Sequence, residues 1–594
     1  MELPPLWPTD SCMSPLDAFS YIGGLMFDEL AALQSRFFAP TWVPGKPVAT
    51  KQGHVQGRRY AFKRGGVDAY LGIPYGKAPI GALRFQKPVP AESWTTVRQC
   101  VEFGPRCPQS EMFFEKYGAS MPEKSEDCLR LNVFAPDWSP KQAGQPNGFA
   151  VMVFIHGGGF AVHSAAHYGD YGICEALCTK DVIIVTIQYR LGIFGFAVGD
   201  GIPENVGLWD QTLALHWVKD NIKVFGGDPD NVTIFGQSAG GACVDLLSLS
   251  PHSRDLFQKV IPMSGTSFCS FAVNSREHVK KACYDYAVAL GYNDQTSKKP
   301  APVDPFFRTP IEFLRSLPWE QLEVGLVSQH INKNGKLDLT PVVDGDFFPK
   351  PLDVLRREMP SKAILTGVID YEGLLFVGLK PGHLKLREEV EKLIQRELVF
   401  HRVVNVDLLK KRLLDMYFDG VDKDNTKEMA LACVKIVSDA YINIGCWRYA
   451  HEMTHLGHTV YRYSFEYFNP KSLGLLGLLL PFQKATHASE IPFIFKKGIT
   501  ANFHPTIDDL KVVDIMTGFF TNFAKNGDPN SVSSNPQIWK PLSTDDTSRY
   551  LSIDLEKMRM CEGLHDRRVE FWLQLLKLES EFRDDKAVAV KPAE

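Results

Sequence analysis

Residues 231–241 read NVTIFGQSAGG, and this stretch decides the fold. Its centre satisfies the pattern G-x-S-x-G around Ser238. The apolar, β-rich run Asn231–Phe235 precedes the pattern, and the helix-forming run Ala242–Leu249 follows it. A strand, a tight turn and a helix in this order hold the serine in a strained conformation and project its hydroxyl from the end of a sheet. The stretch therefore predicts a nucleophilic serine, and the alternative is a serine that only caps a helix.

A second glycine-rich stretch, residues 156–160, reads HGGGF and directly follows the apolar run Val151–Ile155. When a nucleophile attacks an acyl group, an oxyanion forms, and two or three fixed N–H donors must hold it. Glycines let the backbone turn its N–H groups inward with no side chain in the way. A phosphate-binding loop is the alternative, but no Lys-Ser/Thr follows and the spacing is not G-x-G-x-x-G.

Elsewhere along the chain, short apolar runs alternate with stretches whose apolar residues recur at helical spacing. Continuous apolar runs are typical of strands that are buried on both faces of a sheet. The strand candidates are residues 151–155, 182–189, 231–235, 259–263, 363–368 and 459–465, and the helix candidates include 206–225 and 569–582. This alternation predicts an α/β fold with a central, mostly parallel sheet and helices on both faces.

The chain is expected to form a single large domain over residues 45–582. Residues 1–44 precede it as an N-terminal extension, which is partly helical because apolar residues recur near helical spacing in Leu16–Phe38. Residues 583–594 form a polar C-terminal tail.

The composition is that of an ordinary globular protein. Lys and Arg number 65 and Asp and Glu number 69, so the formal net charge is −4. This balance does not favour nucleic acid or an anionic membrane surface as a partner. No apolar run approaches the roughly 18 residues of a membrane span. Met1–Asp10 holds no Lys or Arg, so no signal peptide is predicted and the expected location is cytoplasmic, with the secretory pathway or the extracellular space as the alternative.

Seven motifs, two of them already described, follow one another along the chain in an order that makes the sequence resemble the type-B carboxylesterase family over roughly residues 50–575. They are Gly72-Ile73-Pro74-Tyr75 through Arg84-Phe85, Ser125–Asn132 (SEDCLRLN), the HGGGF stretch, Tyr189-Arg190-Leu191-Gly192, Asn205–Gln211 (NVGLWDQ), Phe225–Pro229 (FGGDP) and the serine pentapeptide. The family includes carboxylesterases, cholinesterases, juvenile-hormone esterases and the catalytically inactive neuroligins. The resemblance implies an α/β-hydrolase fold.

The resemblance also assigns a catalytic triad. Glu372, in the stretch GVIDYEG, matches the family's acid, and His487, in THASEIP, matches its base. Ser238, Glu372 and His487 then follow the α/β-hydrolase order. The implied oxyanion donors are the N–H groups of Gly158, Gly159 and Ala239, and neither a cofactor nor a metal is expected. Composition alone cannot choose His487 among the 16 histidines.

Several structural pairs come from the same resemblance. The expected buried ion pairs are Arg84 with Glu126 and Arg190 with Asp210, and the expected disulfide joins Cys107 to Cys128. Cys446 lies near a later family cysteine, but residues 568–572, where its partner would be, hold no cysteine.

These features predict a serine carboxylesterase that acts on small, uncharged esters. The cholinesterases carry a tryptophan before the SEDC motif and a glutamate before the serine; here Gly118 and Gln237 stand at those places. One alternative is an acyltransferase with the same triad, and another is a catalytically silent, neuroligin-like binding protein. The sequence does not indicate the oligomeric state.

Two other patterns need separate interpretations. His451–His455 reads HEMTH, the zinc-protease pattern H-E-x-x-H, but it ends a predicted helix and the longer pattern is absent, so an ordinary helix end is expected. The apolar run Leu473–Phe482 precedes His487, and it is either a lid or acyl-pocket wall or buried packing between elements.

Overall fold

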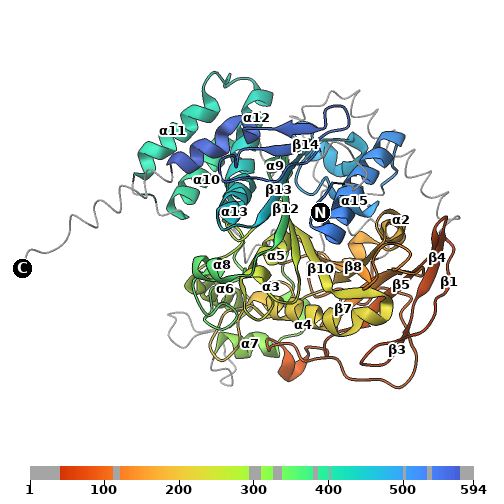
Figure 1. Cartoon of the computed structure of the whole chain (residues 1–594). Coiled ribbons are helices and arrows are strands. Elements are labelled where there is room, and N and C mark those ends of the chain that lie inside the picture. Colours follow the sequence, from red (N-terminus) through yellow and green to blue (C-terminus); the bar gives the residue numbers. More distant parts are fainter. Residues whose placement is uncertain are drawn as a thin grey trace, which may run out of the picture.

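The computed structural model of the chain describes residues 40–110, 121–292, 309–325, 337–378, 386–400, 403, 405–498, 503–530 and 538–575 (Figure 1). Residues 1–39 of the predicted extension, the predicted tail 583–594 and the loop around Gly118 lie outside this part.

A 12-stranded sheet forms the centre of the molecule, with strand order β1-β4-β5-β7-β9-β8-β10-β11-β12-β13-β14-β15. Every neighbouring pair from β9 to β14 is parallel. These seven strands are β9 (Val182–Ile187), β8 (Phe149–Ile155), β10 (Gly227–Gln237), β11 (Lys259–Met263), β12 (Ala363–Ile369), β13 (Thr459–Phe465) and β14 (Tyr550–Ile553). The predicted parallel core is confirmed.

Antiparallel strands extend the sheet at both edges. On the N-terminal side these are β1 (Val43–Pro44), β4 (Arg58–Phe62), β5 (Gly65–Pro74) and β7 (Arg130–Pro136), and at the other edge β15 (Arg559–Cys561). A separate small sheet consists of β2 (Val48–Ala49), β3 (His54–Gln56) and β6 (Arg98–Gln99). None of these strands was among those predicted from the sequence.

Both faces of the sheet are buried, and β8 shows how. Val151, Val153 and Ile155 belong to one apolar core, whereas the alternate residues Met152 and Phe154 belong to the other. This alternation follows from the two-residue period of a strand. On the first face lie α4 (Val206–Asn221) and α5 (Ala239–Leu249), and on the second α2 (Tyr171–Ala176), α14 (Ile491–Phe495) and α15 (Ile507–Asn526).

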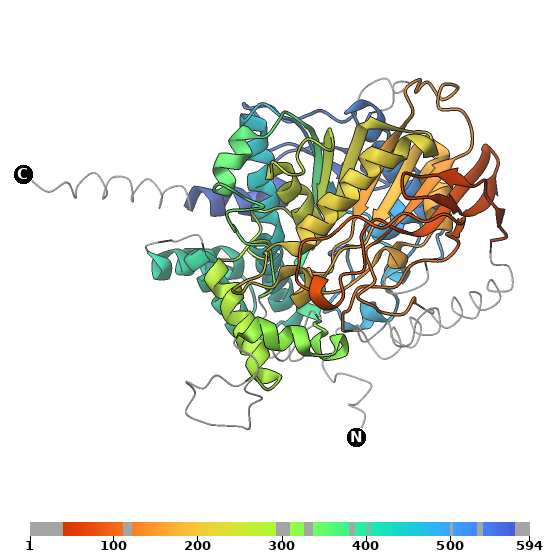
Figure 2. The ribbon, with the colours of Figure 1, turned by 90° about the horizontal axis from the view of Figure 1, so that it is seen from below.

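A helical layer lies at the end of the sheet opposite the N-terminal strands (Figures 1 and 2). It contains α9 (Gly373–Gly378), α10 (Leu386–Phe400), α11 (Val406–Phe418), α12 (Thr426–Ser438), α13 (Ile444–His455) and the helix of residues 568–575. A π-helical turn, Asp439–Asn443, joins α12 to α13. The joined segment Thr426–His455 is long and apolar enough to cross a membrane, but 78% of its most apolar window is buried inside the molecule, as in a core helix.

The remaining described helices are α3 (Gly192–Phe196), α6 (Arg276–Ala289), α7 (Pro310–Ser316) and α8 (Leu352–Glu358).

The predicted pairs form. Arg84 Nε donates to Glu126 Oε1 at 2.7 Å. Arg190 Nε donates to Asp210 Oδ2 at 2.8 Å, and this pair is almost fully buried. Cys107 and Cys128 are joined by a disulfide. These links tie the loops before β7 and after β9 to the rest of the fold.

Candidate active site

Ser238 stands between the end of β10 and the start of α5, with φ 59° and ψ −126°. No L-residue adopts this conformation without strain, so the surroundings must hold it. Its N–H donates to Met263 O at 2.9 Å. A Cβ at Gly240 would lie 2.1 Å from Ile155 O, and one at Gly265 would lie 2.1 Å from Ser238 O. The turn therefore requires these glycines.

The Ser238 side chain does not cap α5, because it makes no capping hydrogen bond to the helix. Ser238 does stand at the N-cap position of α5, but the helix-cap alternative from the sequence has no side-chain hydrogen bond in its support. The strained turn Gly236–Gly240, called the elbow from here on, leaves the hydroxyl at the end of the sheet, as the strand–turn–helix pattern predicts.

Glu372 and His487 lie in direct contact. Glu372 Oε2 is 2.6 Å from His487 Nδ1, and Glu372 Oε1 accepts a hydrogen bond from the N–H of Ile369 at 2.9 Å. Both carboxylate oxygens thus have partners although the side chain is fully buried. In the neutral imidazole with its proton on Nδ1, toward Glu372, the other ring nitrogen, Nε2, is a hydrogen-bond acceptor.

Backbone contacts explain how Glu372 and His487, which are 115 positions apart in the sequence, come together. Tyr371 pairs with Thr486 in a parallel bridge, and the Tyr371 N–H donates to Ala485 O at 3.2 Å. The N–H of Leu375, in the first turn of α9, donates to Thr486 Oγ1 at 2.8 Å. The His487 loop is therefore fastened beside the end of β12, where Glu372 follows.

The same imidazole reaches the elbow. His487 Nε2 lies 3.3 Å from the amide nitrogen of Gln237, the residue that precedes Ser238. Within the described part of the chain Ser238 Oγ makes no hydrogen bond to His487. Gln237 is therefore a partner of the imidazole that the sequence analysis missed, since the contact spans 250 positions.

The glycine loop after β8 runs against the elbow. A Cβ at Gly157 would lie 2.4 Å from Gln237 O, and Gly158 and Gly159 have φ of 99° and 59°. Among the described residues, the N–H groups of Gly158, Gly159 and Ala239 donate to no protein acceptor. Free N–H groups of this kind suit an oxyanion hole.

His156 anchors the start of this loop. Its ring stacks on Tyr189, with centroids 4.6 Å apart, and the Tyr189 hydroxyl donates to His156 O at 2.8 Å. Burial lowers the pKa of His156 to about 3, so this histidine is neutral and structural near pH 7.

Glu490 lies three positions after His487 and is completely buried. Neither carboxylate oxygen has a hydrogen-bond partner among the described residues. Burial first, and the negative charge of Glu372 second, raise the pKa of Glu490 well above its ordinary value. It is therefore protonated where an ordinary glutamate is charged, and no pattern in the sequence indicates this.

The HEMTH stretch lies at the end of α13. His455 Nδ1 contacts His451 O at 2.9 Å, and the two rings stack with centroids 4.2 Å apart. No group of three metal-ligating side chains occurs in the described ranges. The apolar run 473–482 is partly buried: Leu473 and Leu480 are in the core, and the ring of Phe482 packs against Tyr371. This favours packing over a lid.

A mostly parallel sheet whose serine elbow, acid and histidine follow its strands belongs to the α/β-hydrolase class. A family model described as the carboxylesterase family matches residues 44–572, and the chain belongs to this family. It is accordingly a carboxylic ester hydrolase.

Three curated relatives match along nearly their whole length. Esterase cest-33 of Caenorhabditis elegans is 40% identical over 522 residues, which cover 87% of this chain and 92% of the relative. The medium-chain fatty acyl-CoA hydrolase precursor of Anas platyrhynchos is 32% identical, covering 89% and 92%. Gut esterase 1 of Caenorhabditis briggsae is 28% identical, covering 91% and 94%.

Proposed function

We propose that the protein hydrolyses uncharged carboxylic esters through an acyl-enzyme on Ser238. His487 Nε2 takes the Ser238 proton as the hydroxyl oxygen attacks the ester carbonyl, and it returns the proton to the leaving alcohol. Glu372 keeps the imidazole in the tautomer that leaves Nε2 free and stabilises its charged form. The N–H groups of the glycine loop and of Ala239 hold the oxyanion. Water then attacks the acyl-enzyme. His487 Nε2 takes a proton from the water and gives it to Ser238 Oγ as the carboxylic acid leaves.

The contact of Glu372 Oε2 with His487 Nδ1 at 2.6 Å, beside the strained serine, carries this proposal. A silent binding protein has no need of a buried carboxylate that orients a histidine at the elbow. In this structure the side-chain amide nitrogen of Gln237 contacts His487 Nε2. A small turn of the imidazole toward Ser238 Oγ must therefore precede attack. Such hydrogen bonds are often long before substrate binds.

The preference for uncharged esters rests on the residues around the triad. Gln237 is neutral, and the ring of Phe376 lies 5.0 Å from that of His487, with Tyr441 packed edge-on against it. An aromatic wall beside the base favours apolar acyl or alkyl groups. One relative is named as a medium-chain acyl-CoA hydrolase, which is consistent with an apolar acyl group.

The test of hydrolysis is a stopped-flow assay with p-nitrophenyl esters of increasing chain length. The proposal expects a burst of p-nitrophenol, equal in amount to the enzyme, and then steady turnover. A silent, neuroligin-like protein would release none. Adding alcohol or amine acceptors to this assay distinguishes hydrolysis from acyl transfer. An acyltransferase would form more of the acylated acceptor than of the free acid.

The test of substrate charge compares kcat/KM for acetylthiocholine and for an uncharged thioester of similar size. A missing unit charge a few ångströms from the cation removes roughly 1–4 kcal/mol of attraction, depending on the local dielectric. We therefore expect the uncharged thioester to be preferred, and a clear preference for the choline ester would contradict the assignment.

A further inference from the structure

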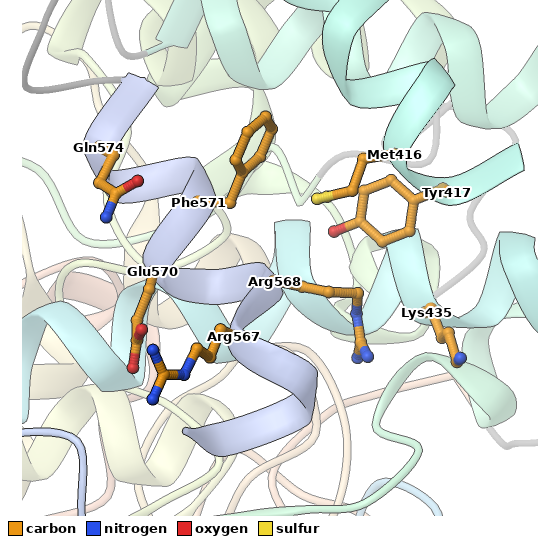
Figure 3. Close-up of a pocket in the computed structure, with 8 residues that line it drawn as sticks. All are labelled: Met416, Tyr417, Lys435, Arg567, Arg568, Glu570, Phe571 and Gln574. Carbon is orange, nitrogen blue, oxygen red and sulfur yellow. The ribbon is translucent and has the colours of Figure 1, made fainter. Parts of the chain in front are cut away.

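A cavity of about 530 Å³ lies between α11, α12 and the helix of residues 568–575 (Figure 3). None of the triad residues lines it. Its volume is within the range of pockets that hold small organic ligands. The cavity is therefore a candidate binding site separate from the active site.

One side of this cavity is cationic. Lys435 of α12 and Arg568 lie on this side, whereas Arg567 lies on the side of the one lining carboxylate, Glu570 (Figure 3). Arg568 is partly neutralised because its Nε donates to Asp439 Oδ2 at 2.8 Å. Lys435 and Arg567 form no ion pair within 4.0 Å in the described ranges. Figure 3 shows the charged ends of Lys435 and Arg568 pointing the same way, so an anion that reaches both is attracted by both.

The single carboxylate does not neutralise this cationic side. Glu570 acts on the buried guanidinium of Arg462, whose pKa is lowered to about 10 by burial and raised by Glu570. One of its oxygens, Oε1, is buried without a hydrogen-bond partner among the described residues. The charge of Glu570 is thus shared with the interior rather than with Lys435.

The other side of the cavity is apolar. Figure 3 shows Phe571 and Met416 facing each other on the side away from the charged ends of Lys435 and Arg568. Aromatic and thioether side chains pack against alkyl chains without requiring one fixed geometry. A ligand that fills the cavity therefore needs an anionic head and an apolar body.

We propose that this cavity binds a carboxylate that bears an apolar chain, with the head at Lys435 and Arg568 and the chain between Met416 and Phe571. The same chemical class includes the acid that ester hydrolysis releases, but binding at this site does not depend on the proposed function. A bound carboxylate also adds a counter-charge next to the Arg568–Asp439 pair, which fastens the C-terminal helix to the π-helical turn.

Calorimetric titration of the full chain with decanoate, below its micellar range, tests the site. Decanoate is expected to bind, whereas acetate lacks the chain and decan-1-ol lacks the charge, so both bind at least tenfold more weakly. Lys435→Gln is expected to weaken decanoate binding by about tenfold, the loss of one charge-assisted contact. Lys427→Gln, an exposed lysine at the other end of α12, is the matched control and leaves binding unchanged.

Photolabelling with a diazirine-bearing decanoic acid locates the bound chain. Label is expected on peptides that contain Met416 or Phe571, and the amount falls in Lys435→Gln but not in Lys427→Gln. Label confined to peptides of the triad, or equal affinity of the two lysine variants, would overturn the proposal. Neither readout requires hydrolysis, so loss of this site and failure of the esterase assignment are distinguishable.

Discussion

At the level of single residues, Glu372 orients the imidazole of His487, and Glu372→Gln tests that role. The amide cannot stabilise the charged imidazole and can force the wrong tautomer, so kcat/KM for a p-nitrophenyl ester is expected to fall by about 10⁴. Circular dichroism verifies the fold. A folded variant that loses less than tenfold would show that another group orients the base.

Glu490 makes stability depend on pH. Its pKa is raised in the folded protein, so the folded state binds more protons than the unfolded state above the ordinary value of 4.5. The contribution of Glu490 to the free energy of unfolding is then fully present below pH 4.5, and it is lost as pH rises through the pKa of Glu490 in the folded protein. Glu490→Gln removes this dependence, so the Tm of the variant relative to the wild type should increase from pH 5 to pH 8. A constant difference in Tm across this range would contradict the raised pKa.

The elbow glycines act at the scale of the strand–turn–helix element. In Gly265→Ala the new Cβ would lie 2.1 Å from Ser238 O, so the loop after β11 must move away from the elbow. A clash of this kind costs roughly 1–3 kcal/mol, and we expect a lower Tm together with lost esterase activity.

Gly518→Ala in α15 is the matched control for this clash. Nothing lies within 4 Å of its new Cβ, and alanine is the better helix former by about 1 kcal/mol, so the Tm should rise with activity unchanged. Equal effects of the two glycine substitutions would contradict the role of the elbow.

The sequence predicts the strands that are continuous apolar runs and misses strands that polar residues interrupt, including buried ones such as β7. β11 and β13 have the predicted bounds, and the predicted helix 206–225 is α4 followed by a 3-10 turn, Ile222–Phe225. Continuous apolar runs mark these elements. β4, β5 and β7 carry polar residues such as Arg59, Asp68 and Asn132, and they are defined by pairing within the sheet, β4 with β5 in a hairpin and β5 with the distant β7. The contacts of Gln237 and Glu490 likewise depend on tertiary packing, and the resemblance alone placed His487.

The cellular location concerns the whole molecule and is a proposal. The cytoplasmic location predicted from the sequence remains a proposal, and the Cys107–Cys128 disulfide favours the secretory alternative because the cytosol keeps thiols reduced. We expect cell fractionation to recover the protein with cytosolic markers. Recovery from the medium or a membrane-enclosed lumen, with a shortened N-terminus, would establish the alternative.

The central claim is that Ser238 carries the acyl group. The most direct measurement is labelling of the full chain with a fluorophosphonate, followed by mass spectrometry of the labelled peptide and kinetics of Ser238→Ala. The account predicts one labelled residue, Ser238, and a fall in kcat on the order of 10⁴–10⁶ in a folded Ser238→Ala protein. Labelling of another residue, or near-normal turnover by the folded variant, would contradict it.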